Sequence, residues 1–85
     1  MVFKLVFSEE SLSQLRKLDN QTAKRILDKI ESTAENPNHF FERLAGREDY
    51  KLRVGDYRVL AKILHGEKTI FILSLGHRKN VYDKG

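Results

Sequence analysis

Three cationic side chains flank one predicted turn: Lys51, Arg53 and Arg58. The turn is Gly55-Asp56, and a glycine followed by another residue is the sequence that a two-residue type II′ hairpin turn prefers. Such a turn places Arg53 directly opposite Arg58, and directly paired residues project from the same face of a sheet. Lys51 precedes Arg53 by two residues, so it shares that face. The sequence therefore predicts that three cations converge on one side of a β-hairpin.

A bound anion explains this cluster better than stability does, because two arginines that face each other across a strand pair repel. A phosphodiester suits the cluster, since guanidinium groups bind phosphate oxygens in a bidentate manner. The alternative is a solvated outer face that is rich in lysine and arginine. The apolar side chains of the hairpin take the other face, against the predicted helices: Tyr50, Leu52, Val54, Tyr57 and Val59.

A further cation and an aromatic ring follow the last predicted strand, residues 69–75. Gly76 permits close approach of the backbone, and Arg78 is near enough in the chain to curl back to the cationic face. Tyr82 has two interpretations, which the residues alone leave open. Its ring either stacks on an unpaired base of RNA or packs on the edge of the sheet.

Other kinds of chemistry find no support in the sequence. The chain has no cysteine, and its histidines at positions 39, 65 and 77 lack the close spacing of metal ligands. We therefore expect neither a metal site nor a cofactor. Residues 66–69 (GEKT) lack the upstream glycine of a phosphate-binding loop, and there is no G-x-S-x-G motif for a serine nucleophile.

The charge of the chain is unevenly distributed. The formal charge of the 85 residues is +4, and the basic excess lies in residues 42–85, which hold ten basic and six acidic side chains. This asymmetry suggests a polyanionic partner, with an evenly solvated face as the alternative. The length fits one domain, residues 1–85. No apolar run approaches the ~18 residues of a membrane span. We therefore expect a soluble, cytoplasmic protein with no membrane partner.

Two periodicities indicate the elements that must position these residues. Residues 2–7 alternate like a strand, and Ser8 followed by two glutamates is typical of a helix N-cap. Asp19-Asn20 interrupts the helical pattern, which restarts near Gln21 and ends at Asn36-Pro37. From residue 50 the period changes to two, which predicts strands at residues 50–54, 57–64 and 69–75.

This order of elements predicts an α+β fold. An N-terminal strand and a helical hairpin precede an antiparallel three-stranded meander, and both helices pack on one face of the sheet. Residues 38–47 show no clear pattern. Within them, we expect Phe40, Phe41 and Leu44 to anchor the segment to the core.

Three stretches together resemble a known family of small proteins: residues 50–59 (YKLRVGDYRV), 75–78 (LGHR) and 81–82 (VY). They are similar to the RelE/ParE superfamily of toxins from toxin–antitoxin systems, on the RelE side. The resemblance covers nearly the whole chain, because that family also begins with a strand and a helical hairpin before its antiparallel sheet. It agrees with the order of elements predicted above.

The resemblance implies an endoribonuclease, an mRNA interferase that cleaves message in the ribosomal A site without a metal. The ribose 2′-hydroxyl would attack the adjacent phosphate. The implied partners are mRNA on the ribosome, the surrounding 16S rRNA surface and a cognate antitoxin that neutralises the toxin in a hetero-oligomer. Carried over to this sequence, the catalytic set falls on Lys51, Arg53, Arg58, Arg78 and Tyr82, and the RNA-binding set on Lys51, Arg53, Arg58, Arg78 and Lys79.

The resemblance also implies individual roles. Arg58 and Arg78 would stabilise the extra charge on the phosphorane, with Arg78 nearest the leaving 5′-oxygen. Arg53 stands where some relatives have lysine, which keeps the charge but removes a possible proton acceptor. The general base is then Lys51 or Tyr82, each of which needs a pKa lowered by the neighbouring cations.

Two competing functions belong to other classes. ParE-like relatives share the fold but are described as inhibitors that act on DNA gyrase. A non-catalytic RNA-binding module is the other alternative, and it predicts salt-sensitive binding without a cleaved product.

Overall fold

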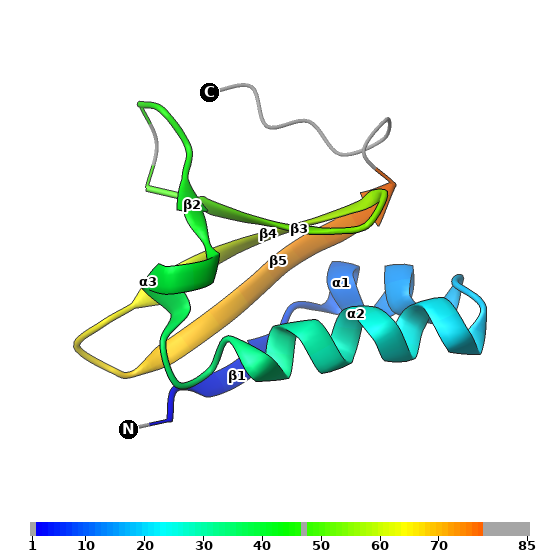
Figure 1. Cartoon of the computed structure of the whole chain (residues 1–85), viewed down its shortest axis with the longest axis horizontal. Coiled ribbons are helices and arrows are strands. Elements are labelled where there is room, and N and C mark those ends of the chain that lie inside the picture. Colours follow the sequence, from blue (N-terminus) through cyan, green and yellow to red (C-terminus); the bar gives the residue numbers. More distant parts are fainter. Residues whose placement is uncertain (1, 47, 78–85) are drawn as a thin grey trace.

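The computed structural model describes residues 2–46 and 48–77, which form a layer of helices packed against one face of a five-stranded sheet (Figure 1). The predicted α+β class is therefore confirmed. The elements in chain order are β1 (Lys4–Phe7), α1 (Glu9–Arg16), α2 (Asn20–Ser32), α3 (Pro37–Phe40), β2 (Glu42–Arg43), β3 (Tyr50–Val54), β4 (Tyr57–Leu64) and β5 (Thr69–His77).

Side-chain caps start both long helices where the sequence predicted. The Ser8 hydroxyl accepts a hydrogen bond from the backbone N–H of Ser11, and the Asp19 carboxylate accepts one from the backbone N–H of Thr22. The Thr22 hydroxyl also donates to Asp19, and these hydrogen bonds lower the pKa of the Asp19 carboxyl. Helix α2 ends at Ser32, four residues before the predicted stop. Pro37 instead opens the short helix α3, where its missing N–H is not needed.

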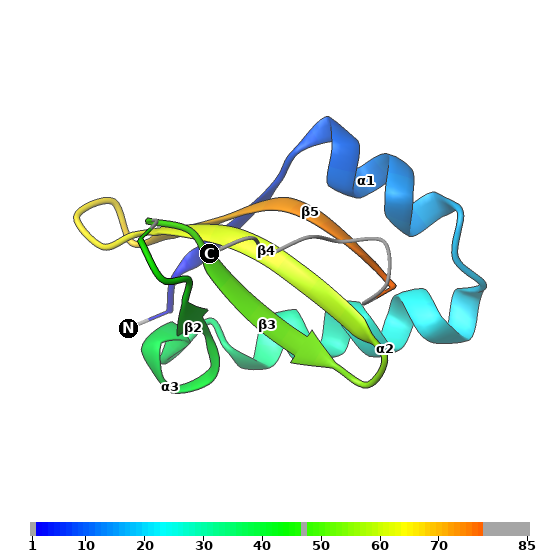
Figure 2. The ribbon, with the colours of Figure 1, turned by 90° about the horizontal axis from the view of Figure 1, so that it is seen from above.

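The sheet extends the predicted meander at both edges. Strands β3, β4 and β5 are antiparallel neighbours, as expected, and the sheet order is β1-β5-β4-β3-β2. Strand β1 pairs in parallel with β5, and the two-residue strand β2 pairs with the start of β3. Helix α1 packs against β5 and α2 against β3, so the helical hairpin covers one face of the sheet (Figure 2).

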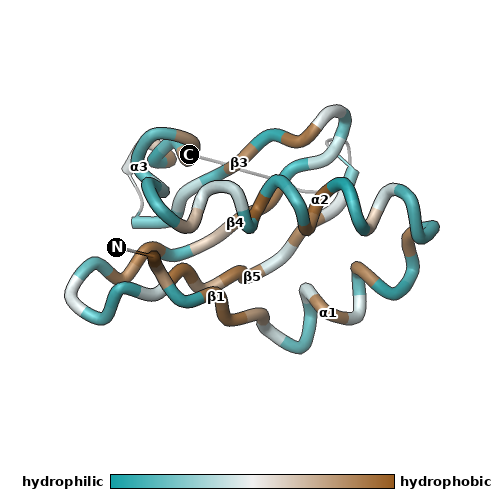
Figure 3. Tube along the Cα trace, turned by 60° about the horizontal axis from the view of Figure 1, so that its bottom comes forward, coloured by the Kyte–Doolittle hydropathy of each residue, from teal (hydrophilic) through white to brown (hydrophobic). Residues whose placement is uncertain are grey.

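The core lies between the helices and the sheet. Apolar residues at helical spacing on α2 pack against inward-facing residues of β4 and β5. In Figure 3 much of β5 is hydrophobic, whereas hydrophobic and hydrophilic residues alternate along α2. The largest fully buried apolar side chains are Ile26, Ile30, Val59, Ile70, Ile72 and Leu75. None of the helices in the described ranges is long and apolar enough to cross a membrane.

Residues 38–46 connect the two faces of the sheet. Phe41 is buried in the main core, and Phe40 packs against that core, as expected. Leu44 departs from the expectation because it packs with Leu60 on the face turned away from the helices. The reason is the alternation of β4: its neighbours Val59 and Ala61 face the helices, so Leu60 must face outward.

The hairpin turn depends on Gly55. Its φ of +59° is positive, Asp56 is not among the residues with positive φ, and this combination is the predicted type II′ geometry. A Cβ at Gly55 would also lie 2.9 Å from the Arg25 side chain. We expect Gly55→Ala to lower the free energy of unfolding by about 1–2 kcal/mol. In contrast, Gly66→Ala should have little effect in the same urea titration, since a Cβ there meets open space. Equal losses in the two variants would contradict this account of the turn.

Candidate functional site

The β3–β4 hairpin has the predicted register. Arg53 lies opposite Arg58, Lys51 lies opposite Leu60, and Leu52 lies opposite Val59. Leu52 and Val59 are buried toward the helices, whereas Arg53 is exposed and Lys51 and Arg58 are half-buried. The structure therefore brings Lys51, Arg53 and Arg58 together on the helix-free face of the sheet, and we call these three side chains the cationic cluster.

Glu42 supplies an acidic neighbour to this cluster that the sequence did not reveal. The Oε1 atom of Glu42 lies 4.0 Å from Nζ of Lys51, and the two residues are direct partners in the β2–β3 register. Glu42 is exposed, so this ion pair contributes little to stability. The pair places one carboxylate beside the cationic cluster, at the start of β3.

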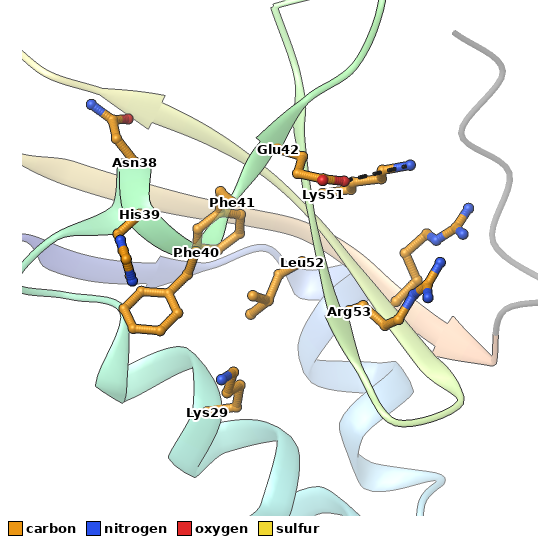
Figure 4. A pocket seen from close by; sticks show the side chains of 10 residues that line it. Lys29, Asn38, His39, Phe40, Phe41, Glu42, Lys51, Leu52 and Arg53 are labelled. Carbon is orange, nitrogen blue, oxygen red and sulfur yellow. Dashed lines mark ion pairs between the residues drawn. The ribbon is translucent and has the colours of Figure 1, made fainter.

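A cavity of about 540 Å³ crosses the edge of β3 beside the cationic cluster. Figure 4 shows Lys51 and Arg53 extending to one side of β3 and Leu52 to the other. The residues that line the cavity come from α2, α3, β2 and the β3–β4 hairpin: Lys29, Asn38, His39, Phe40, Phe41, Glu42, Lys51, Leu52, Arg53 and Arg58.

The far wall of this cavity combines a cation with aromatic rings. Nζ of Lys29 lies 5.0 Å from the centroid of the Phe40 ring, and the His39 ring meets Phe40 edge-on at 4.9 Å. Sequence reasoning placed Phe40 only in the core and gave Lys29 no role. The sequence provided little reason to single out Lys29 as a site residue, because α2 carries other charged residues on the same surface.

The end of β5 completes the described part of the site. Gly76 lies opposite Arg58 and so belongs to the helix-free face, where it adds no side chain over the cluster. His77 lies opposite Tyr57, and their rings meet edge to face at 5.6 Å. The predicted site residues Arg78, Lys79 and Tyr82 lie outside the described residues.

No group of three or more His, Asp or Glu side chains within residues 2–46 and 48–77 is arranged to hold a metal ion. The chemistry available in the described part of the site comes from cations, one carboxylate and the edge of a sheet. These features define a small α+β domain with a cationic cluster on the helix-free face of its sheet.

Comparison with known proteins identifies the family. Residues 5–82 match the family model described as ParE toxin of type II toxin–antitoxin system, parDE. The chain therefore belongs to the RelE/ParE superfamily and is a toxin of the toxin–antitoxin type. No curated protein sequence is significantly similar to it.

Solved structures of RelE toxins share the fold. The chain is 21% identical to the matching chain of the toxin–antitoxin complex RelBE2 from Mycobacterium tuberculosis, with a TM-score of 0.85 over 92% of this chain and 100% of that one. For the intact RelBE complex of E. coli, the identity is 26% and the TM-score 0.74, over 88% and 95% of the two chains. For the RelB–RelE complex of Methanococcus jannaschii, the values are 26% and 0.69, over 92% and 95%.

Proposed function

We propose that this toxin is a ribosome-dependent endoribonuclease that cleaves mRNA in the A site without a metal ion. The observation that carries the proposal is the directly opposed pair of Arg53 and Arg58, with Lys51 beside it. Like charges at directly opposed positions destabilise a sheet, so a protein that retains them gains something else from them. A bound phosphodiester would supply that gain, and it is the substrate class that the resemblance to RelE toxins implies.

The proposed reaction needs no group that the chain lacks. The ribose 2′-oxygen attacks the adjacent phosphorus as a base takes the 2′-hydroxyl proton, the P–O5′ bond breaks, and the leaving 5′-oxygen takes a proton from water. The products are a 2′,3′-cyclic phosphate and a 5′-hydroxyl end. Arg58 and Arg78 stabilise the additional negative charge on the phosphorane, while Arg53 and Lys79 bind the RNA backbone. Lys51 or Tyr82 accepts the proton.

Lys51 lies 4.0 Å from Glu42 and Tyr82 lies outside the described residues, so both stay candidates for the base. The basic excess of residues 42–85 supports contact with the 16S rRNA surface, and a ribosomal substrate implies a cytoplasmic location.

Primer extension on ribosome-bound message tests the proposal. We expect new 5′ ends within the A-site codon when the toxin is added to programmed ribosomes, and no cleavage of the same RNA in free solution. Treatment of the toxin alone with EDTA, followed by removal of the chelator before the toxin is added to programmed ribosomes, should not reduce the cleavage. Intact message on the ribosome would refute the proposal. The description of the family model as ParE favours one alternative, a DNA gyrase inhibitor. A supercoiling assay with purified gyrase run in parallel distinguishes the two functions.

A cognate antitoxin is the proposed protein partner, in a hetero-oligomer. The solved relatives above are complexes of RelE with RelB. A partner that binds only the folded toxin stabilises it by mass action, by about 2.7 kcal/mol at a free concentration one hundred times the Kd. We therefore expect the protein encoded beside this toxin to raise its melting temperature in a concentration-dependent way. No shift at saturating concentration would show that the wrong partner had been chosen.

A further inference from the structure

Strand β5 contains a β-bulge at Leu73. Leu60 of β4 pairs with Ser74, but the next residue, Ala61, pairs with Ile72, so Leu73 has no partner opposite it. A bulge inserts one residue into a strand and reverses the alternation of the side chains that follow. Ile72 faces the helices before the bulge, and Leu75 faces them after it.

The bulge decides which residue of β5 faces the cationic cluster. With the bulge, Gly76 lies opposite Arg58, and Leu75 is fully buried. Without it, an uninterrupted alternation would turn Leu75 outward beside the cluster and Gly76 inward. The sheet face that the proposed reaction uses therefore depends on this single inserted residue.

Ser8 holds the bulge from the start of α1. Its backbone N–H donates to the carbonyl oxygen of Ile72 at 2.9 Å, and its hydroxyl donates to the carbonyl oxygen of Leu73 at 2.6 Å. Successive carbonyls in a regular strand point to opposite edges. At the bulge, the carbonyl oxygens of the consecutive residues Ile72 and Leu73 both accept hydrogen bonds from Ser8. A regular strand would not point both of these carbonyls toward the same residue, so Ser8 binds the bulged conformation of the backbone. The same hydroxyl accepts from Ser11 and caps α1.

Gln14 holds the strand on the far side of the bulge. The backbone N–H of Leu75 donates to Oε1 of Gln14 at 2.6 Å. Strand β1 ends at Phe7, opposite Ile72, and so cannot pair with this part of β5. Side chains of α1 therefore bind the backbone groups of β5 beyond the point where β1 ends.

We propose that Ser8 and Gln14 are positioning residues for the proposed ribonuclease reaction, which hold the Leu73 bulge and thereby the register that sets Gly76 against Arg58. Neither side chain touches the cationic cluster. Both act through the backbone of β5, which ends at His77. This inference rests on the proposed function for its catalytic consequence, whereas its structural part can be tested without any activity.

The catalytic test compares variants that differ in one hydrogen bond. Gln14→Met keeps the size of the side chain and removes the acceptor, whereas Gln14→Glu keeps an acceptor oxygen. Displacement of a catalytic group by 1 Å can slow a reaction by up to about 10²-fold, so we expect Gln14→Met to lower kcat on programmed ribosomes about tenfold. KM should not change, and Gln14→Glu should restore kcat.

Ser8→Ala has its own matched control. Both Ser8→Ala and Asp19→Ala remove a helix N-cap, but only Ser8 also binds β5. We expect a lower melting temperature in both variants, with the larger fall in Ser8→Ala because it also loses the hydrogen bond to β5, and kcat per folded molecule reduced only in Ser8→Ala. An unchanged kcat in both Gln14→Met and Ser8→Ala, or an equal reduction in Asp19→Ala, would overturn the proposal.

Amide hydrogen exchange separates this inference from the proposed function. In Gln14→Met, the Leu75 amide should exchange about tenfold faster or more, while the Ile70 amide, which is remote from the bulge, keeps its protection. If the wild-type protein cleaves no RNA, the proposed function fails, and this exchange measurement still tests whether the bulge is held. Unchanged protection of Leu75 in Gln14→Met would refute the role of Gln14.

Discussion

Replacement of Arg58 by alanine should reduce cleavage of ribosome-bound message by about 10²–10³-fold in a protein that still folds. Arg58 lies on the middle strand of the sheet, near the hairpin turn, opposite Arg53 on one side and Gly76 on the other. A phosphate held by the cationic cluster would meet its guanidinium group as charge develops on the phosphorane. Single-turnover cleavage on programmed ribosomes, with thermal unfolding of the same preparation, measures both quantities.

Two further variants separate a specific role of Arg58 from general electrostatics. Arg58→Lys keeps the charge but loses the fork of donors, so its rate should fall between those of wild type and Arg58→Ala. Lys62→Ala removes an exposed cation four residues along the same strand, opposite Phe71, and should leave the rate unchanged. Equal losses in Lys62→Ala and Arg58→Ala would show that β4 contributes only a diffuse positive field.

The features that the sequence predicted correctly are set by local interactions. The register of the β3–β4 hairpin follows from one turn, because Gly55 adopts the positive φ that a two-residue loop needs. Once the turn is known, simple alternation assigns Arg53 and Arg58 to the same face. The helix start at Ser8 was equally legible, since an N-cap is a contact within four residues of the chain. Asp19-Asn20 was predicted only as the point where the helical pattern restarts, and the structure shows that Asp19 is the N-cap there.

The features that the sequence did not predict depend on contacts between distant segments. Strand β2 has two residues, too few to show any periodicity, and it exists only because Glu42 and Arg43 pair with β3. The ion pair of Glu42 with Lys51 and the packing of Lys29 on Phe40 follow from that pairing and from the position of α2. The parallel pairing of β1 with β5 joins residues more than sixty positions apart.

The last strand was predicted over residues 69–75, and it runs two residues further, to His77. The prediction assumed one unbroken alternation over residues 69–75, whereas the bulge at Leu73 reverses the alternation within that range. A reversal of alternation in sequence resembles the end of a strand. What distinguishes a bulge from an end is the set of groups that bind the backbone there, and these come from α1.

Neutralisation of Arg53 should have opposite effects on stability and on cleavage. Arg53 is exposed, lies directly opposite Arg58, and lines a second cavity together with Arg25 and Lys29 of α2. The repulsion of opposed cations costs a few tenths of a kcal/mol, which is about what a cross-strand charge pair contributes with the opposite sign. We therefore expect Arg53→Gln to keep or raise the melting temperature at low salt and to lower kcat/KM for RNA cleavage by about 10²-fold.

Two measurements test whether Arg53 lowers stability and supports cleavage: the salt dependence of the melting temperature, and a matched variant at Lys62. The gain in melting temperature of Arg53→Gln should shrink as salt screens the opposed pair, over a Debye length of about 10 Å at 0.1 M. Lys62→Gln removes one charge from the same face without an opposed cation, so it should show neither the gain nor the loss of cleavage. A site that binds an anion tolerates repulsion in its free form because the ligand removes it. If Arg53→Gln were strongly destabilised and fully active per folded molecule, Arg53 would instead be a structural residue, and the anion-binding role of the cationic cluster would be wrong.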